Sequence, residues 1–261
     1  MRLTLILFIV VQVMLGCISC TSTKKTVYFY NVQDTTYLQG NPEKEPLIQP
    51  NDILSITIGS LNADASALYN LPSNNAVKST TATGASTEIG GYLVGTNGTI
   101  QLLGGLGSIQ AAGLTKTALR DNITSLILSR KVLVDPSVEI RFLNYEVTVL
   151  GEVAKPTVIT VPNERISLLK ALGLAGDLTI FGRRDNVLLI REENGKKKTR
   201  HIDLNSGNFF NSPFYYLQPN DVVYVQPNKA KVASAGRTQQ LLPLLLSVLS
   251  IIVVVLDRVK F

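Results

Sequence analysis

Residue types that commonly carry enzyme chemistry are scarce in this chain. The single histidine, His201, lies in an alternating, strand-like run, where an exposed or packed position is favoured over a catalytic one. Both cysteines, Cys17 and Cys20, lie close to the N-terminus, so no cluster of Cys and His can form a metal site. The sequence GGLG at 104–107 lacks the Lys-Ser/Thr pair of a phosphate-binding loop. We therefore predict no catalytic, cofactor-binding or metal-binding residues, and no enzyme activity.

The two thiols suit a different chemistry, which is lipid attachment. Arg2 is followed by the apolar run LTLILFIVVQVMLG, which has the length of a signal peptide and is too short for a typical spanning helix. The next residues, GCISC, resemble a bacterial lipoprotein cleavage site, in which a cysteine after a small residue is lipidated. We predict lipidation at Cys20, where polar sequence begins, with Cys17 as the less favoured position. An ordinary signal peptide with two incidental cysteines is the alternative.

Charge and length limit the remaining classes of function. The chain has 25 Lys and Arg against 19 Asp and Glu, a net charge of +6. The basic residues are scattered and form no stripe interleaved with aromatic residues, so nucleic acid is not an expected partner. A length of 261 residues allows one or two domains with a sizeable core.

The first part of the chain predicts an α+β unit. Pro50-Asn51-Asp52 is typical of a turn, and the alternating apolar residues after it predict a strand. Thr115 is a plausible N-cap for a helix with apolar residues at helical spacing. Ser, Thr, Asn and Ala dominate 62–90, which predicts a long mobile loop. The expected elements are strands at 26–32, 47–60 and 134–144, glycine-interrupted strands with a hairpin turn at Asn97-Gly98 over 90–115, and a helix after Thr115.

From Tyr145 onwards the pattern predicts a second α+β unit. Asn194-Gly195 between two strand-like runs is a strong hairpin signal. The closing phrase YLQPNDVVYV nearly repeats LIQPNDILSI of the first unit, and good turn chemistry before a strand is sufficient to explain both. The expected elements are two strands at 145–161, a helix at 166–178, a hairpin at 186–204 and a strand at 216–228.

These motifs together resemble a known family. The lipoprotein-like start, IQPNDILSITI and GYLVGTNGTIQLLGGLGSIQAAGLTKTAL resemble the polysaccharide biosynthesis/export domain. The stretch from VTVLGEVAKPTVITV to YLQPNDVVYV resembles the soluble-ligand-binding β-grasp (SLBB) domain. In this order they resemble the outer-membrane polysaccharide export lipoproteins. One apparent β-grasp unit is present, whereas the longest members of that family have two or more.

The resemblance implies an architecture and a set of partners. It implies ring-shaped homo-oligomers that conduct capsular polysaccharide or exopolysaccharide from the periplasm to the cell surface, with an inner-membrane polysaccharide co-polymerase as partner. The protein would be lipid-anchored in the outer membrane, with most of the chain in the periplasm. The expected fold class is α+β, an export domain followed by a β-grasp (SLBB) domain and a C-terminal transmembrane helix. The expected boundaries are a signal peptide at 1–19, an anchor segment and linker at 20–46, the export domain at 47–144 with loop 62–90, the SLBB domain at 145–228, a linker at 229–238 and the transmembrane helix at 239–258.

The apolar C-terminal run supports this expectation by its length. Residues 241–256 would form a helix of about 24 Å, close to the roughly 25 Å apolar band of outer-membrane proteins. One side of that helix would be weakly polar, and we predict that it faces neighbouring helices or a pore. A plain single-pass anchor is the alternative, whereas a core helix is disfavoured by the lack of a polar face. The predicted stripe consists of Gln240, Pro243, Ser247, Ser250 and Asp257.

Two classes of function follow. The first is a transport component that conducts polysaccharide. The second is a non-transporting envelope lipoprotein whose β-grasp unit binds sugar or scaffolds other proteins.

Overall fold

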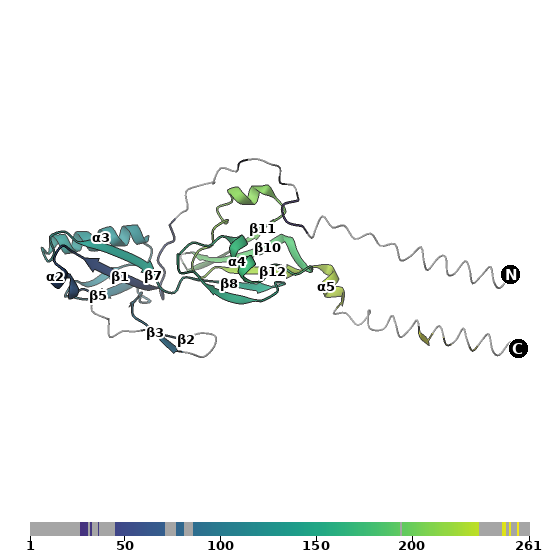
Figure 1. The fold of residues 1–261 in the computed structure, drawn as a ribbon, viewed down its shortest axis with the longest axis horizontal. Coiled ribbons are helices and arrows are strands. Elements are labelled where there is room, and N and C mark those ends of the chain that lie inside the picture. The colour runs from purple at the N-terminus through teal and green to yellow at the C-terminus, as the bar shows by residue number, and fades with distance from the viewer. Residues whose placement is uncertain are drawn as a thin grey trace.

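The computed structural model describes two α+β units that lie end to end (Figure 1). The described residues are 27–30, 32, 36, 45–70, 77–80, 86–193, 195–234, 247–248, 251 and 255, and at 77–80 and 86–89 the description covers the backbone alone. The first unit holds α2 (Ala63–Ala67) and α3 (Lys116–Ser129), and the second holds α4 (Leu168–Leu174) and leads into α5 (Lys229–Ser234).

A three-stranded antiparallel sheet with the order β4-β1-β7 forms the centre of the first unit. The central strand lies where the apolar residues after Pro50-Asn51-Asp52 predicted one, and side chains of β7 alternate between buried and exposed as predicted for 134–144. Asn97-Gly98 lies in a turn, with Gly98 at φ 81°, but the strands before and after this turn belong to different sheets, so the predicted hairpin at this position was wrong. The strands are β1 (Ile53–Gly59), β4 (Tyr92–Leu93) and β7 (Ser137–Phe142), with a separate hairpin of β5 (Thr99–Leu102) and β6 (Gly107–Gln110).

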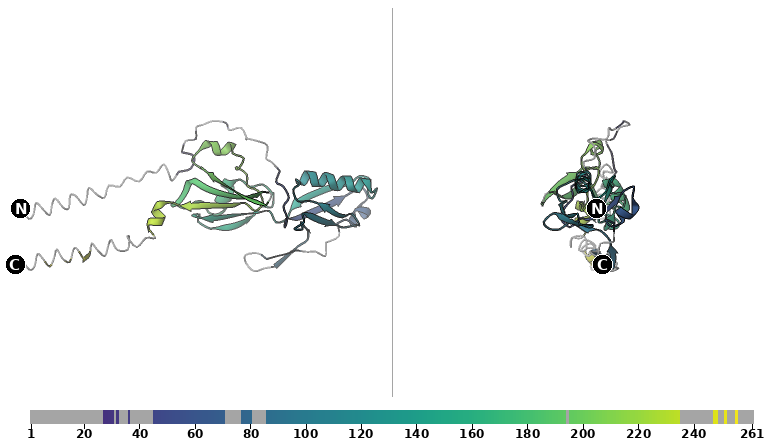
Figure 2. Two further views of the ribbon diagram at one scale, coloured as in Figure 1. Left: turned by 180° about the vertical axis from the view of Figure 1, so that it is seen from behind. Right: turned by 90° about the vertical axis from the view of Figure 1, so that its left-hand side faces the viewer.

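Helix α3 (Lys116–Ser129) packs against this sheet, as Figures 1 and 2 both show. The hydroxyl oxygen of Thr115 accepts a hydrogen bond from the backbone N–H of Ala118 at 3.1 Å, so the predicted N-cap is confirmed. Leu119, Ile123 and Ile127 follow the period of the helix and are fully buried. The helix thereby supplies much of the first unit's core.

The stretch 62–90 contains secondary structure that the sequence analysis did not predict. Helix α2 (Ala63–Ala67) is capped by Asn62, and strands β2 (Val77–Thr80) and β3 (Ser86–Ile89) pair as an antiparallel hairpin. The prediction of one loop was wrong in this respect, because polar hairpin strands carry no alternation of apolar residues that would reveal them.

The second unit is built on a five-stranded mixed sheet with the order β11-β10-β12-β8-β9. Its first and last strands, β8 and β12, are parallel neighbours inside the sheet, and each has an antiparallel strand on its other side, β9 beside β8 and β10 beside β12. This is the arrangement of a β-grasp sheet. The strands are β8 (Glu146–Gly151), β9 (Thr157–Thr160), β10 (Gly182–Glu193), β11 (Lys196–Ile202) and β12 (Val222–Pro227).

Helix α4 (Leu168–Leu174) lies near this sheet and buries Leu168, Ala171 and Leu172. Gly176 follows the helix at φ 78°, the left-handed conformation that commonly ends a helix. The helix, the two strands within 145–161, the hairpin at 186–204 and the final strand therefore occur where the pattern of the second unit predicted them. A 3-10 helix at Gly207–Asn211 and the segment that follows it cover one end of the sheet's core face.

The aromatic stretch near the N-terminus is not a strand. Residues 28–30 form a turn in which Phe29 adopts φ 55°, and its N–H donates to the carbonyl of Leu204 at 3.2 Å. The Phe29 ring stacks on Phe210, with centroids 5.0 Å apart, and Tyr28 donates a hydrogen bond to Asp177. The predicted strand at 26–32 was wrong, because its aromatic side chains pack on a cluster of the second unit rather than in a sheet.

The two units are joined by contacts of Glu164, in the loop after β9. Its carboxylate accepts a hydrogen bond from the N–H of Phe142 at 2.6 Å and forms an ion pair with Lys116. Gln49 of the first unit also donates to the carbonyl of Glu192 in the second, at 2.9 Å. Hydrogen bonds therefore cross the junction between the two units at two separate places.

The predicted C-terminal transmembrane helix must be corrected. Among the residues that the structure describes, no helix is long and apolar enough to cross a membrane. Helix α5 (Lys229–Ser234) has six residues, and of 239–258 only Ser247, Val248, Ile251 and Val255 are described, each in helical conformation. The apolar composition of 241–256 predicted a spanning helix, but composition alone does not establish a continuous one. The remainder of that segment lies outside the described residues.

Candidate functional site

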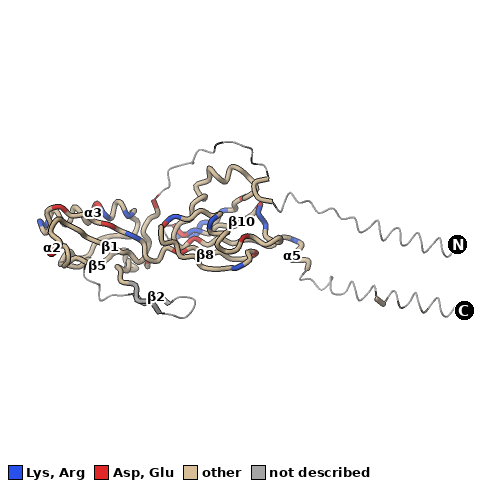
Figure 3. The backbone as a smooth tube through the Cα atoms, viewed as in Figure 1, with Lys and Arg blue, Asp and Glu red and all other residues tan. Residues whose placement is uncertain are grey.

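The strongest candidate site lies on the core face of the β10–β11 hairpin. Alternate residues of a strand point to the same face, and in this register Arg191 lies opposite Lys198 and Leu189 lies opposite Arg200. The Gly195 turn at φ 69° sets that register. The hairpin extends beyond the core towards its turn, so its last inward-facing residues are charged. Figure 3 shows basic residues gathered around β10.

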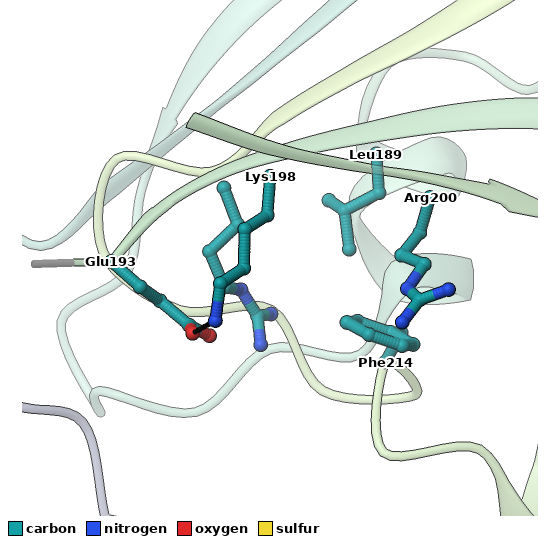
Figure 4. Close-up of a pocket in the computed structure, with 6 residues that line it drawn as sticks. Leu189, Glu193, Lys198, Arg200 and Phe214 are labelled. Atoms are coloured by element: carbon teal, nitrogen blue, oxygen red, sulfur yellow. Dashed lines mark hydrogen bonds and ion pairs between the residues drawn. The ribbon is translucent and has the colours of Figure 1, made fainter. Parts of the chain in front are cut away.

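These residues line an open pocket of about 220 Å³. In Figure 4, Leu189 and Phe214 face each other across it. Arg200 closes one side, and the ion pair of Lys198 with Glu193 closes the other (Figure 4). The lining residues are Leu189, Arg191, Glu193, Lys198, Arg200 and Phe214.

Arg191 is the buried cation of the pocket, with 5% of its surface exposed. Its Nε and Nη2 donate to the carboxylate of Asp221 at 2.9 and 2.7 Å, and Nη2 also reaches the carbonyl of Tyr216 at 3.3 Å. Its Nη1 has no hydrogen-bond partner among the described residues. The buried carboxylate of Asp221 thus fixes the guanidinium of Arg191, and Nη1 remains available to donate to a ligand in the pocket.

Phe214 brings an aromatic ring into this cationic surrounding. The guanidinium carbon of Arg191 is 5.5 Å from the ring centroid, and that of Arg200 is 5.8 Å away. Both distances allow cation–π attraction. Arg200 is exposed and forms no ion pair with a described residue. The pocket therefore combines an apolar face with positive charge that is only partly neutralised.

The turn that supplies Asp221 has a counterpart in the first unit. In each QPND turn the aspartate oxygen accepts a hydrogen bond from the N–H of the glutamine, at 2.7 Å, and the asparagine has a positive φ, 72° in one and 64° in the other. A local hydrogen bond thus holds both turns, in agreement with the turn chemistry that the sequence predicted. Asp52 differs in having no ion pair with a described residue, although only 2% of its surface is exposed. Burial raises the pKa of Asp52 to about 6, and the hydrogen bond from Gln49 opposes that rise.

Most of the residues that the sequence singled out lie outside the described residues. Cys17 and Cys20 lie outside the described residues, so lipidation stays a prediction. Of the predicted polar stripe only Ser247 is described, and it is exposed. The stripe members outside the described residues are Gln240, Pro243, Ser250 and Asp257.

His201 lies on β11, is exposed and belongs to the face opposite the pocket, because it pairs with Leu188. Within the described part of the chain no group of His, Cys, Asp and Glu is placed to hold a metal ion.

The sequence patterns did not single out the pocket residues of β10 and β11, nor Phe214, which follows the 3-10 helix. The predicted hairpin carried part of the signal, because alternation about an Asn-Gly turn places Arg191, Lys198 and Arg200 on one face. Phe214 gave no such signal, since its position depends on how residues 203–217 fold back over the sheet.

The fold and the pocket thus define a two-unit α+β protein with a β-grasp sheet and a cationic surface pocket. Comparison with known proteins then identifies its two domains. The model described as polysaccharide biosynthesis/export protein matches residues 40–143, and the model described as SLBB domain matches residues 145–225. The predicted resemblance to an export domain followed by an SLBB domain is thereby confirmed. The matched export family is one of export proteins rather than of enzymes.

Two curated relatives share this similarity. The EPS I polysaccharide export outer membrane protein EpsA of Ralstonia solanacearum is 30% identical over 153 residues, which is 57% of this chain and 40% of the relative. The EpsA protein of Ralstonia nicotianae is 31% identical over 158 residues, 59% of this chain and 40% of the relative. The matched region therefore spans less than half the length of either relative.

Proposed function

We propose that this protein is an outer-membrane polysaccharide export protein that conducts capsular polysaccharide or exopolysaccharide from the periplasm to the cell surface. The observation that carries the proposal is the succession of an export domain and an SLBB domain in one chain. The names of both relatives, which describe outer-membrane export proteins, support the same activity.

The proposed export complex is a homo-oligomeric ring that works with an inner-membrane polysaccharide co-polymerase. An incompletely covered apolar face of the second sheet supports the ring. On that face Leu150 and Val158 are 42% and 52% exposed, and Leu188, Ile190 and Tyr224 are only partly buried. These residues alternate with the core residues of their strands and therefore share the outer side of the sheet. Apolar residues gathered on one surface favour contact with another protein surface.

Membrane attachment in this proposal uses the lipidated Cys20. Acyl chains contribute about 0.8 kcal/mol per buried CH₂, so more than one chain gives durable anchoring. A Cys20→Ser variant should lose lipid labelling and leave the membrane fraction, while Cys17→Ser should remain in it. Labelling that persists in Cys20→Ser and disappears in Cys17→Ser would move the modification to the other cysteine.

The central test is deletion of the gene in its native cell, followed by measurement of extracellular and periplasmic polysaccharide. Export predicts loss of the surface polymer, with restoration by the full chain. Unchanged surface polymer would contradict the export role. The second candidate function, a non-transporting lipoprotein that binds sugar, is favoured by the pocket at β10–β11 and predicts that unchanged result together with sugar binding.

The ring is tested separately through Leu150. Leu150→Asp places a charge on the outer face of the sheet, and Leu61→Asp is the matched control at a position that is 90% exposed in the first unit. Native mass measurement of the detergent-extracted protein should show a smaller assembly for Leu150→Asp alone. A monomer for the unmodified chain, or equal assemblies for both variants, would contradict an interface on this face.

A further inference from the structure

The pocket at β10–β11 has the composition of a binding site for an anion. Three of its six lining residues are cations and one is a carboxylate. Glu193 is paired with Lys198, and Asp221 balances Arg191 from behind, which leaves the charge of Arg200 without an ion-pair partner among the described residues. Lys196 and Lys197 add positive charge on the same exposed edge strand. A negatively charged group in the pocket would therefore be attracted by the surrounding charge.

The arrangement of the donors favours a carboxylate. Arg191 is held rigidly by Asp221 and by the carbonyl of Tyr216, so little freedom is lost when its remaining Nη1 binds a ligand. Arg200 lies two positions along β11 from Lys198, on the same face. The guanidinium carbons of Arg191 and Arg200 lie 5.5 and 5.8 Å from the centroid of the Phe214 ring, so the two groups can donate charge-assisted hydrogen bonds to one planar anion.

The apolar surfaces of the pocket favour a sugar ring over a simple anion. Leu189 and Phe214 face each other across the space between the cations (Figure 4). A pyranose ring has an apolar face of C–H groups that can lie on an aromatic ring, whereas the side chain of Asp or Glu would leave most of Phe214 uncovered. A volume of about 220 Å³ is below the roughly 300–1,000 Å³ of pockets for drug-sized ligands, so it suits one sugar unit.

The geometry points to a binding site for one acidic sugar residue, a uronate, with its carboxylate on Arg191 and Arg200 and its ring against Phe214. This inference rests on the proposed function, because an exported polysaccharide supplies the ligand class. It makes the SLBB domain a contact point for the acidic units of the polymer.

The test measures binding of defined oligosaccharides to the full chain by calorimetry at fixed salt. A hyaluronan hexasaccharide and an oligogalacturonate supply uronates in two linkages, chitohexaose is the neutral probe, and hexaglutamate supplies carboxylates without a sugar ring. At least one uronate probe should bind, and chitohexaose should bind about tenfold more weakly or not at all, as expected for the loss of charge-assisted hydrogen bonds.

Arg200→Gln should weaken uronate binding about tenfold, because it removes a charge-assisted donor. Lys197→Gln is the matched control, since it removes the same charge from the same strand but on the opposite face, where residue 197 pairs with Glu192. Both side chains are exposed, so both variants should fold. Phe214→Leu, which keeps an apolar side chain, should weaken binding of the uronate and leave binding of hexaglutamate unchanged.

Three results would overturn the inference. The first is no binding of either uronate probe. The second is an equal loss of affinity in Arg200→Gln and Lys197→Gln, which would indicate diffuse electrostatic attraction. The third is binding of hexaglutamate as tight as that of the uronates, which would assign the pocket to an acidic protein segment.

Failure of this site is distinguishable from failure of the export role. If gene deletion abolishes surface polysaccharide and no uronate binds, the site is wrong and export stands. If uronates bind through Arg200 while gene deletion leaves the surface polymer unchanged, the site stands and the export role is wrong.

Discussion

The two QPND turns predict opposite effects for the same substitution. Asp52 and Asp221 accept the same backbone hydrogen bond at 2.7 Å, but among the described residues only Asp221 has a cationic partner, Nη2 of the buried Arg191 at 2.7 Å. Removing the charge from Asp52 should therefore relieve an uncompensated buried carboxylate. Removing it from Asp221 should create an uncompensated buried cation.

The size of the effect at Asp52 follows from its pKa. Burial raises that pKa from 3.8 to about 6, and each pKa unit corresponds to about 1.4 kcal/mol, so the ionised carboxylate destabilises the folded state by about 3 kcal/mol. Between these two values the folded state binds more protons than the unfolded state. The free energy of unfolding therefore falls as the pH rises through this window, and the full destabilisation is present above pH of about 7.

Asp52→Asn keeps an acceptor oxygen for the N–H of Gln49 and removes the titrating charge. We expect it to raise the free energy of unfolding by about 1–3 kcal/mol at pH 7.5, because the extra amide N–H group offsets part of the gain. The difference between variant and unmodified protein should shrink by about 2 kcal/mol on going to pH 4.5. Urea unfolding followed by circular dichroism at both pH values measures these quantities.

Asp221→Asn is the matched control, and it should lower the free energy of unfolding by about 3–5 kcal/mol at pH 7.5 because Arg191 stays buried without its partner. The reasoning is refuted if Asp52→Asn destabilises the protein as much as Asp221→Asn does. It is also refuted if the difference between Asp52→Asn and the unmodified protein does not change with pH.

Four further substitutions test how the segments are held together. Tyr28→Ala should remove the hydrogen bond to Asp177 and release the N-terminal turn, which would appear as faster proteolysis before residue 46 and a loss of about 1–3 kcal/mol. Gly151→Ala should destabilise the protein by at least about 3 kcal/mol in thermal unfolding, because its Cβ would meet the carbonyl oxygen of Val225 at 2.1 Å. Gly195→Ala has an open surrounding and should cost about 1 kcal/mol. Glu164→Ala should increase the relative motion of the two units in solution scattering, and an unchanged profile would show that its contacts with Phe142 and Lys116 do not hold the junction.

Local sequence patterns predicted most of the regular elements. Thr115 marks the start of α3 because its hydroxyl satisfies a free N–H of the first turn, a purely local interaction. The Asn194-Gly195 signal predicted the β10–β11 hairpin because a positive φ in a tight turn depends on residue type alone. The same local logic failed at residues 26–32, whose aromatic residues resemble a strand but pack on Phe210 and Leu204 instead.

The apolar composition of the C-terminal run also led to a wrong prediction, that of a transmembrane helix. An apolar run has the same hydropathy whether or not it forms a continuous helix, and no described helix of this chain is long and apolar enough to span a membrane. The stretch 62–90 shows the converse, because polar residues there form a hairpin through backbone hydrogen bonds that composition does not reveal.

The sequence by itself determined the order of the elements, the two QPND turns and the resemblance to polysaccharide export proteins, since these depend on neighbouring residues and on linear motifs. Tertiary structure alone decided that Asp221 has a buried arginine as partner, whereas Asp52 has no ion pair within the described part of the chain, although their turns are nearly identical in sequence. It also decided that Phe214 lies beside Arg191 and Arg200. Such pairs join residues from separate segments, and their burial and charge balance arise only when the sheet and the covering segment pack together.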